Sequence, residues 1–250
     1  MIDRYINNKI NAIWNDQNRF DTWKLIQEKY VETLEELKIA EAGIAKKIRK
    51  AEISKEEVYK QEKVTNHDLA SFVDILQKKV GEGSNWVHYG LTSSDIVDSA
   101  NSLLIIQSIE IAQELILELL KELKLKAIKN KDTKIIGRTH GVYAEETFLG
   151  NIFGNWYLEI KRSLDRVERA KVSIAYGKLS GPVGNHTVVT EEMEKITLEK
   201  LGLKPEIFAS QIVSRDRYAE VFTSLSILAS TYERISTNLR SYQRSEISEM

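Results

Sequence analysis

The sequence predicts an all-α protein. Apolar residues recur three and four positions apart along most of the chain, which is the spacing of one helix face. Only two prolines occur, Pro182 and Pro205, and no segment alternates convincingly between apolar and polar residues as a half-buried strand does. These three observations together indicate helices nearly throughout.

The first clear helix begins near Phe20. Apolar residues then return at one helical face, namely Trp23, Ile26, Tyr30, Leu34 and Leu37. A glycine-rich turn, "VGEGSNWVHYG" at residues 80–90, follows the next helical segments. We therefore expect a smaller N-terminal helical domain over residues 1–100 and the first part of a long-helix bundle over residues 101–250.

Three long helices are expected in the second part, at 101–129, at roughly 144–176 and from Arg217 to the last residue. The first is apolar around much of its circumference, with side chains such as Leu104, Leu115 and Leu117 on different faces. Such a helix must be covered on several sides, in a bundle core or between subunits. No stop signal follows the third helix, so we expect the chain to end within it.

The composition excludes several classes of partner. Lys and Arg number 36 against 37 Asp and Glu, for a net charge of -1, so no basic field attracts nucleic acid or anionic lipid. The absence of cysteine excludes disulfides and thiolate metal sites and fits a reducing compartment. The start "MIDRYINNKI" lacks an apolar signal region, and polar residues interrupt every apolar stretch. We expect a soluble, cytoplasmic protein.

The chain has only four histidines, and each lies at a predicted junction between helical segments: His67, His88, His140 and His186. Loops held by a rigid scaffold are frequent places for chemistry. The simpler alternative is that polar residues collect in loops. Four histidines in this position favour the chemical interpretation more than any one of them does.

Two junctions have the form Thr-x-x-Asp, close to a capping box, beginning at Thr65 and at Thr92. We expect both threonines to be helix N-caps. A helix start with free N–H groups, beside hydroxyls such as those of Ser93 and Ser94, also binds phosphate or carboxylate well.

The segment "GRTHG" is similar to these helix starts. Arg138 offers a fork-shaped donor for a carboxylate or phosphate, and Thr139 offers a hydroxyl. A histidine held near such an anion keeps its proton and suits a general acid. Spacing alone leaves the reaction open.

Three alternatives to this interpretation fit the sequence less well. A metal site would need ligands from distant segments, because neither a His-x-x-x-His pair nor a cysteine occurs. The segment "GEGSNW" follows a helix and lacks the lysine and third glycine of nucleotide-binding loops. A helical interaction module stays open as an alternative, although it does not explain the histidine junctions.

Six segments, in this order, resemble the adenylosuccinate lyase family of the fumarase/aspartase superfamily. They are Arg4-Tyr5 with "AIWNDQNRFDTWKLIQ", "NHD" at 66–68, "VHYGLTSSDIVDSA" at 87–100, "GRTHGVYAEETFLG" at 137–150, "GKLSGPVGN" at 177–185 and "SQIVSRDRYAEVFTSLS" at 210–226. The resemblance extends from end to end of the chain, and "TSSD" separates this group from other members of the superfamily.

The resemblance implies a β-elimination that needs no metal or organic cofactor. Adenylosuccinate would give AMP and fumarate, and SAICAR would give AICAR and fumarate. It implies catalytic roles for His140, as the general acid, and for His67. It also implies substrate-binding roles for residues from several loops and helix starts: Arg4, Tyr5, Asn66, Asp68, His88, Thr92, Ser93, Arg138, Thr139 and Gln211. The family fold further implies a homotetramer, with each active site built from three subunits.

Three departures from the family pattern matter. Tyr143 and Glu146 stand where the family usually has histidine and proline. The segment around His186 differs, so this histidine inherits no role and is expected to be structural. The Gly-Ser-Ser-x-Met-Pro loop that carries the catalytic base has no match in the 250 residues. We therefore expect the N-terminal portion of a longer lyase, inactive by itself.

Two function classes stay open. The first is a lyase whose remaining segments are supplied elsewhere, with argininosuccinate lyase as the nearest rival in substrate. The second is a helical binding or scaffold protein derived from the lyase, which keeps the grip on the substrate without the base. Release of fumarate distinguishes the two classes.

Overall fold

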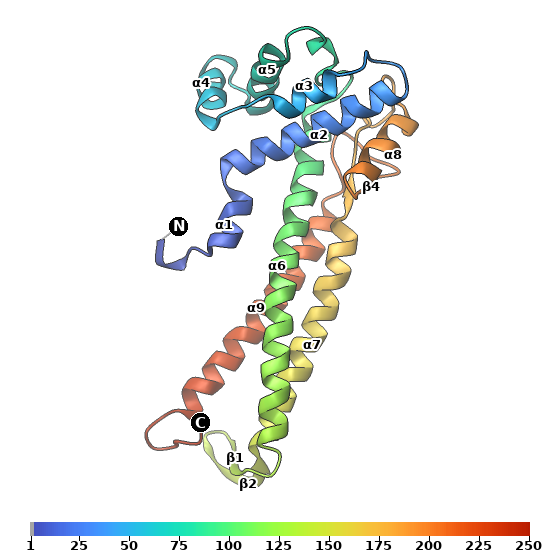
Figure 1. The fold of residues 1–250 in the computed structure, drawn as a ribbon. Coiled ribbons are helices and arrows are strands. Elements are labelled where there is room, and N and C mark those ends of the chain that lie inside the picture. Colours follow the sequence, from blue (N-terminus) through green and yellow to red (C-terminus); the bar gives the residue numbers. More distant parts are fainter. Residues whose placement is uncertain (1–2) are drawn as a thin grey trace. The chain divides into compact units, whose positions relative to one another are not determined.

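The computed structural model describes residues 3–250, which form two compact units (Figure 1). The first unit contains Met1–Ser108 and Ile174–Arg215, and the second contains Ile109–Ser173 and Asp216–Met250. Each unit thus draws on two separate stretches of chain. The consecutive domains expected from the sequence, 1–100 and 101–250, stay a prediction.

The first unit is a cluster of short helices around α2 (Asp16–Glu36). Its other helices are η1 (Asp3–Tyr5), α1 (Asn8–Trp14), α3 (Ile44–Lys50), α4 (Lys55–Thr65), α5 (Asp68–Val80), η2 (Ser84–Trp86), the start of α6 (Ser93–Lys129) and α8 (Glu191–Lys200). The strands β3 (Tyr176–Gly177) and β4 (Lys204–Pro205) pair in parallel, and α8 lies between them in the sequence.

The predicted apolar face of α2 forms the centre of the first unit. Phe20, Trp23, Ile26, Tyr30 and Leu34 are all buried, and Leu37 packs against them at the helix end. The ring of Trp23 meets Phe20 and Phe72 edge to face, with centroids 5.3 and 5.6 Å apart. Burying several aromatic rings in one cluster makes this face a large source of stability.

The second unit contains the rest of α6, a hairpin of β1 (Lys134–Thr139) and β2 (Val142–Phe148), α7 (Leu149–Ile174) and α9 (Asp216–Tyr242). The long helices are linked by ion pairs: Lys171 of α7 lies 2.7 Å from Glu110 of α6, and Arg234 of α9 pairs with Glu159 of α7. The all-α expectation is confirmed, with two small two-stranded sheets added.

Two helix boundaries predicted from the sequence are wrong. The helix expected from about 144 begins at Leu149, because residues 134–148 form the antiparallel hairpin. The helix expected to reach the last residue ends at Tyr242, beyond which the chain turns back: the N–H of Glu249 donates to the carbonyl of Tyr242 over 3.1 Å.

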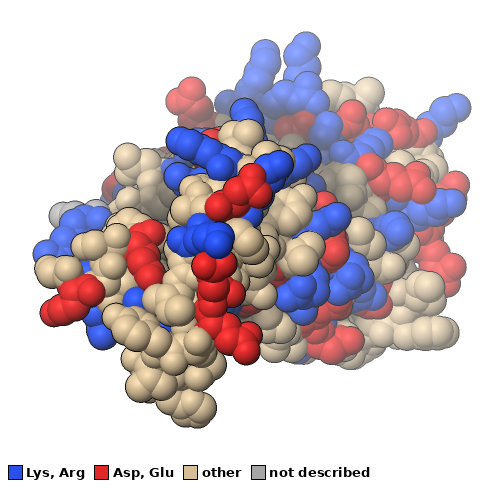
Figure 2. All heavy atoms as spheres, turned by 90° about the horizontal axis from the view of Figure 1, so that it is seen from below, with Lys and Arg blue, Asp and Glu red and all other residues tan. Residues whose placement is uncertain are grey.

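Charge of both signs is interspersed over the face drawn in Figure 2. That face therefore carries no broad field of one sign, in keeping with the near-equal totals of acidic and basic residues. No helix within residues 3–250 combines the length and apolar character that crossing a membrane requires.

Candidate active site

The start of α6 has the predicted arrangement. Ser93 is its first residue, and the Thr92 N–H donates to Oδ2 of Asp95 over 2.8 Å, as the acid of a capping box accepts from the N-cap backbone. The hydroxyl of Ser93 and the first N–H groups of this long helix therefore lie at the positive end of the helix dipole. This arrangement suits an anion.

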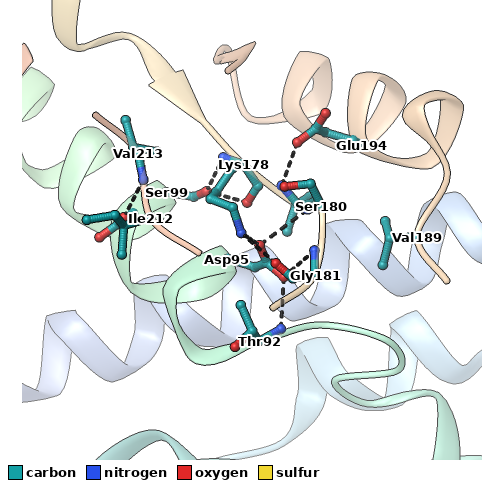
Figure 3. A network of polar contacts seen from close by, with 12 residues as sticks. Thr92, Asp95, Ser99, Lys178, Ser180, Gly181, Val189, Glu194, Ile212 and Val213 are labelled. Carbon is teal, nitrogen blue, oxygen red and sulfur yellow. Dashed lines mark hydrogen bonds and ion pairs between the residues drawn. The ribbon is translucent and has the colours of Figure 1, made fainter. Parts of the chain in front are cut away.

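A buried ion pair between Asp95 and Lys178 fixes the helix start to the loop that follows β3 (Figure 3). Both side chains are completely buried. Asp95 also accepts from the N–H groups of Ser180 and Gly181, at 3.3 and 3.2 Å, and the Lys178 ammonium donates to the Gly181 carbonyl over 3.0 Å. Burial raises the pKa of the Asp95 carboxyl, while Lys178 and the N–H donors oppose that shift.

A third segment, residues 206–213, reaches the same place. Gly184 has a φ of +74°, and a Cβ there would lie 2.1 Å from the carbonyl oxygen of Ala209, so only glycine permits this approach. The Val213 N–H donates to Asp98 of α6 over 2.9 Å. We call the residues 87–95, 178–190 and 206–213 the loop cluster. Gln211 lies in it with an exposed side chain.

His67 is the N-cap of α5, where its Nδ1 accepts from the Ala70 N–H over 3.3 Å. The prediction of Thr65 as the N-cap is wrong: it is the last residue of α4, and its hydroxyl donates to the His67 carbonyl over 3.1 Å. Asn66 supplies the left-handed turn between the two helices, with a φ of +54°.

The side chain of His67 also contacts the start of α6. Its Nε2 lies 3.4 Å from the Ser93 hydroxyl, and Oδ1 of Asp68 lies 3.4 Å from its Nδ1. About half of the His67 and Asp68 side chains is exposed, 50% and 46%. The imidazole is therefore open to a ligand as well as bonded to the scaffold.

His88 lies on the loop before α6 with a φ of +63°. Its Nδ1 lies 2.9 Å from the side-chain amide nitrogen of Gln27, on α2. Burial and the proximity of His67 lower the pKa of His88 to about 4. The imidazole is therefore neutral at pH 7.

Arg4 and Tyr5 lie in η1, with both side chains exposed. The Arg4 guanidinium lies over the Tyr5 ring, 4.9 Å from its centroid. Such a pair offers a cation beside an exposed aromatic face. The aromatic face could stack against a nucleobase, and the guanidinium could bind a phosphate.

In the second unit, His140 and Gly141 form the two-residue turn of the β1–β2 hairpin. Both have positive φ, +55° and +77°, as the central residues of a type I′ turn require. The similarity of "GRTHG" to the two helix starts is therefore not structural, because the segment forms a hairpin turn and α7 begins nine residues after His140, at Leu149. The imidazole and Thr139 are exposed at the tip.

Arg138 shows that its guanidinium binds a carboxylate. Its Nη1 and Nη2 donate to the two oxygens of Glu249, at 2.6 and 3.2 Å. Nη1 also donates to the Ile136 carbonyl over 3.3 Å, and the Tyr143 ring lies with its centroid 5.2 Å from the guanidinium carbon. Glu146 pairs with Lys134 across the strands at 2.9 Å. Tyr143 and Glu146, the two residues that depart from the family pattern, thus both contact residues of β1.

His186 lies within the loop cluster, and its contacts are with the scaffold. Its Nδ1 lies 3.0 Å from the Val189 carbonyl, so that nitrogen carries a proton and donates. Its Nε2 lies 3.6 Å from Oε2 of Glu194, whose Oε1 accepts from the Leu179 N–H over 2.7 Å. Burial raises the pKa of Glu194.

Within each unit the structure brings some of the predicted site residues together. His67, Asp68 and Ser93 form one group, while Arg138, Thr139 and His140 form another in the second unit. Gln27 and Lys178 are functional candidates that the sequence did not indicate, because each reads as an ordinary residue of its segment. Within residues 3–250, no group of three or more His, Asp or Glu side chains could hold a metal ion.

Comparison with known proteins assigns the sequence to a family. A family model described as "Lyase" matches residues 7–250. The chain belongs to this lyase family. The lyase chain is 40% identical to the adenylosuccinate lyase of Thermotoga maritima, 38% to that of Aquifex aeolicus and 37% to that of Bacillus subtilis. The resemblance found in the sequence is confirmed.

These alignments cover 100% of the lyase chain and 58% of each relative, so the chain spans less than two thirds of their length. The fold also matches solved structures. A fumarate lyase from Mesorhizobium sp. has a TM-score of 0.90 at 20% identity, covering 96% of this chain and 58% of that one. A β-carboxy-cis,cis-muconate cycloisomerase from Acinetobacter calcoaceticus has the same score and identity.

Proposed function

We propose that this chain is part of an adenylosuccinate lyase, which releases fumarate from adenylosuccinate to give AMP and from SAICAR to give AICAR. The proposal rests chiefly on the match to adenylosuccinate lyases along the whole chain, at 33–40% identity in the relatives compared. The reaction breaks a C–N bond. A base takes the proton from the carbon beside a carboxylate, the electron pair forms the C=C bond of fumarate, and the leaving nitrogen gains a proton.

His140 is the proposed general acid that protonates the departing nitrogen. Its place at an exposed hairpin tip supports the role, because a two-residue turn presents the imidazole without a covering side chain. Arg138 and Thr139 precede it, and an anion bound by Arg138 would favour the protonated imidazole. The base has no match among these residues, so the chain contributes the acid and the anion-binding groups.

Thr92 and Ser93 are proposed to hold the carboxylates of the fumaryl part, supported by the helix start and the adjacent His67. Arg4 and Tyr5 are proposed nucleotide contacts, with Asn66, Asp68, His88 and Gln211 as further substrate contacts. No cofactor is part of the proposal. We also propose a cytoplasmic enzyme, since a chain without cysteine fits a reducing compartment.

We further propose a homotetramer with shared active sites. The apolar faces of α6 support an assembly: Ile116 and Leu120 are buried, while Leu115 and Leu117 are 50% and 55% exposed within one chain. A long helix with apolar residues outside its own core is suited to a helix of another subunit. Sedimentation of the full-length protein would test this mass directly.

The activity test uses the full-length protein that contains this chain. Adenylosuccinate, SAICAR and argininosuccinate are supplied separately, and fumarate is measured. Fumarate from the first two and not from the third supports the proposal. Fumarate from argininosuccinate alone would assign the rival substrate, and no fumarate from any of them would favour the binding-protein alternative.

A further inference from the structure

Gln27 is a completely buried glutamine on α2 whose side chain contacts one histidine. Its Oε1 accepts from the backbone N–H of His88 over 2.9 Å. Its Nε2 lies 2.9 Å from Nδ1 of the same residue. The two residues are 61 positions apart in the sequence, so tertiary packing alone brings them together.

The two contacts together determine which imidazole nitrogen carries the proton. A backbone N–H can only donate, so it must face the amide oxygen of Gln27. The amide NH₂ then faces Nδ1, and because an NH₂ group can only donate, Nδ1 must accept. The neutral imidazole of His88 therefore carries its proton on Nε2.

The backbone of His88 depends on the same amide. A non-glycine residue with a φ of +63° is in the left-handed region, which is normally unfavourable. The amide oxygen of Gln27 satisfies the His88 N–H in this conformation. One buried side chain therefore sets both the direction and the protonation of the ring.

The outer nitrogen remains available to a ligand. Within the described residues, Nε2 of His88 has no hydrogen-bond partner, and it is not one of the fully buried unpartnered atoms. Burial, with a smaller contribution from the nearby His67, keeps the pKa of His88 low. The neutral imidazole therefore donates through Nε2–H, and because its pKa is low it does not readily take up a second proton.

We infer that Gln27 is a positioning residue that fixes His88 as a neutral Nε2–H donor toward an anionic oxygen of the substrate. This rests on the proposed function, in which His88 lines the site. The role differs from that of His140, which must release a proton. A donor that stays neutral holds a carboxylate or phosphate oxygen without competing as a second acid.

The test uses imidazole nitrogen NMR on the full-length protein, with wild type, Gln27→Glu and the control Gln77→Glu. Gln77 donates to the carbonyl of Val87, at 3.4 Å, so the control adds the same charge beside the same loop without facing the ring. The wild type should show His88 protonated at Nε2 alone at pH 7. In Gln27→Glu, a carboxylate facing Nδ1 favours the imidazolium, and the His88 pKa should rise by about 1 to 3 units.

Gln77→Glu should leave the His88 pKa close to that of the wild type. Fumarate and AMP are then titrated separately, and the one that shifts the Nε2 signal identifies a carboxylate or a phosphate as the acceptor. An Nδ1–H tautomer, an unchanged pKa in Gln27→Glu, or no response to either ligand would overturn the inference. Fumarate release by the same wild-type sample is the separate measure of the proposed function.

Discussion

Replacing Lys178 with methionine should destabilise the first unit strongly. The substitution keeps an unbranched side chain of similar size and removes the ammonium that pairs with Asp95, both groups being completely buried. Removing one partner of a buried pair costs about 3–5 kcal/mol, because the other charge stays buried without compensation. Asp95 keeps three backbone donors, those of Thr92, Ser180 and Gly181, so we expect about 3 kcal/mol.

A double-mutant cycle separates this charge effect from lost packing. Asp95→Asn alone leaves the Lys178 ammonium buried with the Gly181 carbonyl, and it should cost a similar amount. Lys178→Met with Asp95→Asn leaves no buried charge. The double variant should therefore be more stable than the sum of the single effects, by about 2 kcal/mol or more.

Urea unfolding followed by tryptophan fluorescence measures these free energies, and Lys171→Met is the matched control. Lys171 also pairs with a carboxylate, that of Glu110 at 2.7 Å, but its side chain is 32% exposed. Its loss should cost less than about 1 kcal/mol. If Lys178→Met is no more costly than the control and the cycle shows no coupling, the buried pair does not hold the loop cluster together.

Two further predictions concern the loop cluster. Gly184→Ala should destabilise the protein more than Gly202→Ala in thermal unfolding, because both glycines have positive φ, +74° and +71°, but only a Cβ at Gly184 meets the Ala209 carbonyl. Equal losses would show that backbone strain alone is responsible. The second prediction follows from the pKa of His88, about 4 in the folded protein and about 6.5 when unfolded. Between pH 6.5 and 4 the unfolded state binds the proton that the folded state excludes, so the free energy of unfolding falls as the pH falls, by up to about 1.4 kcal/mol per pH unit. His88→Asn should weaken this slope in urea unfolding measured across that window, and an unchanged slope would contradict the low pKa.

Local sequence patterns predicted the elements that depend on local rules. The apolar period from Phe20 identified α2, and the position of Thr92 identified the start of α6. The same rules failed where two neighbouring residues could each serve as a helix N-cap. Thr65 and His67 can both cap a helix, and the structure uses His67 because α4 continues through Thr65. The hairpin was missed because most residues of β2 are exposed and neither strand alternates between apolar and polar positions, although the His-Gly turn is a signal that could have found it.

The supports of the site could not be predicted from the sequence. Gln27 and His88 are 61 positions apart, and Asp95 and Lys178 are 83 apart, so no local spacing relates them. A buried lysine also contradicts the usual preference of that side chain for solvent, and only its partner explains it. The proposed chemical residues lie in or beside turns and helix starts with recognisable sequence, whereas the residues that orient them come from distant parts of the chain that the fold packs together.

The central claim is that His140 protonates the leaving group in an adenylosuccinate lyase. The most direct test compares fumarate release from adenylosuccinate by the full-length wild type and by full-length His140→Ala, with circular dichroism to confirm equal folding. The exposed position of His140 makes loss of stability small. We expect kcat to fall by a factor of about 100 or more. Fumarate release at the wild-type rate by His140→Ala would contradict the account.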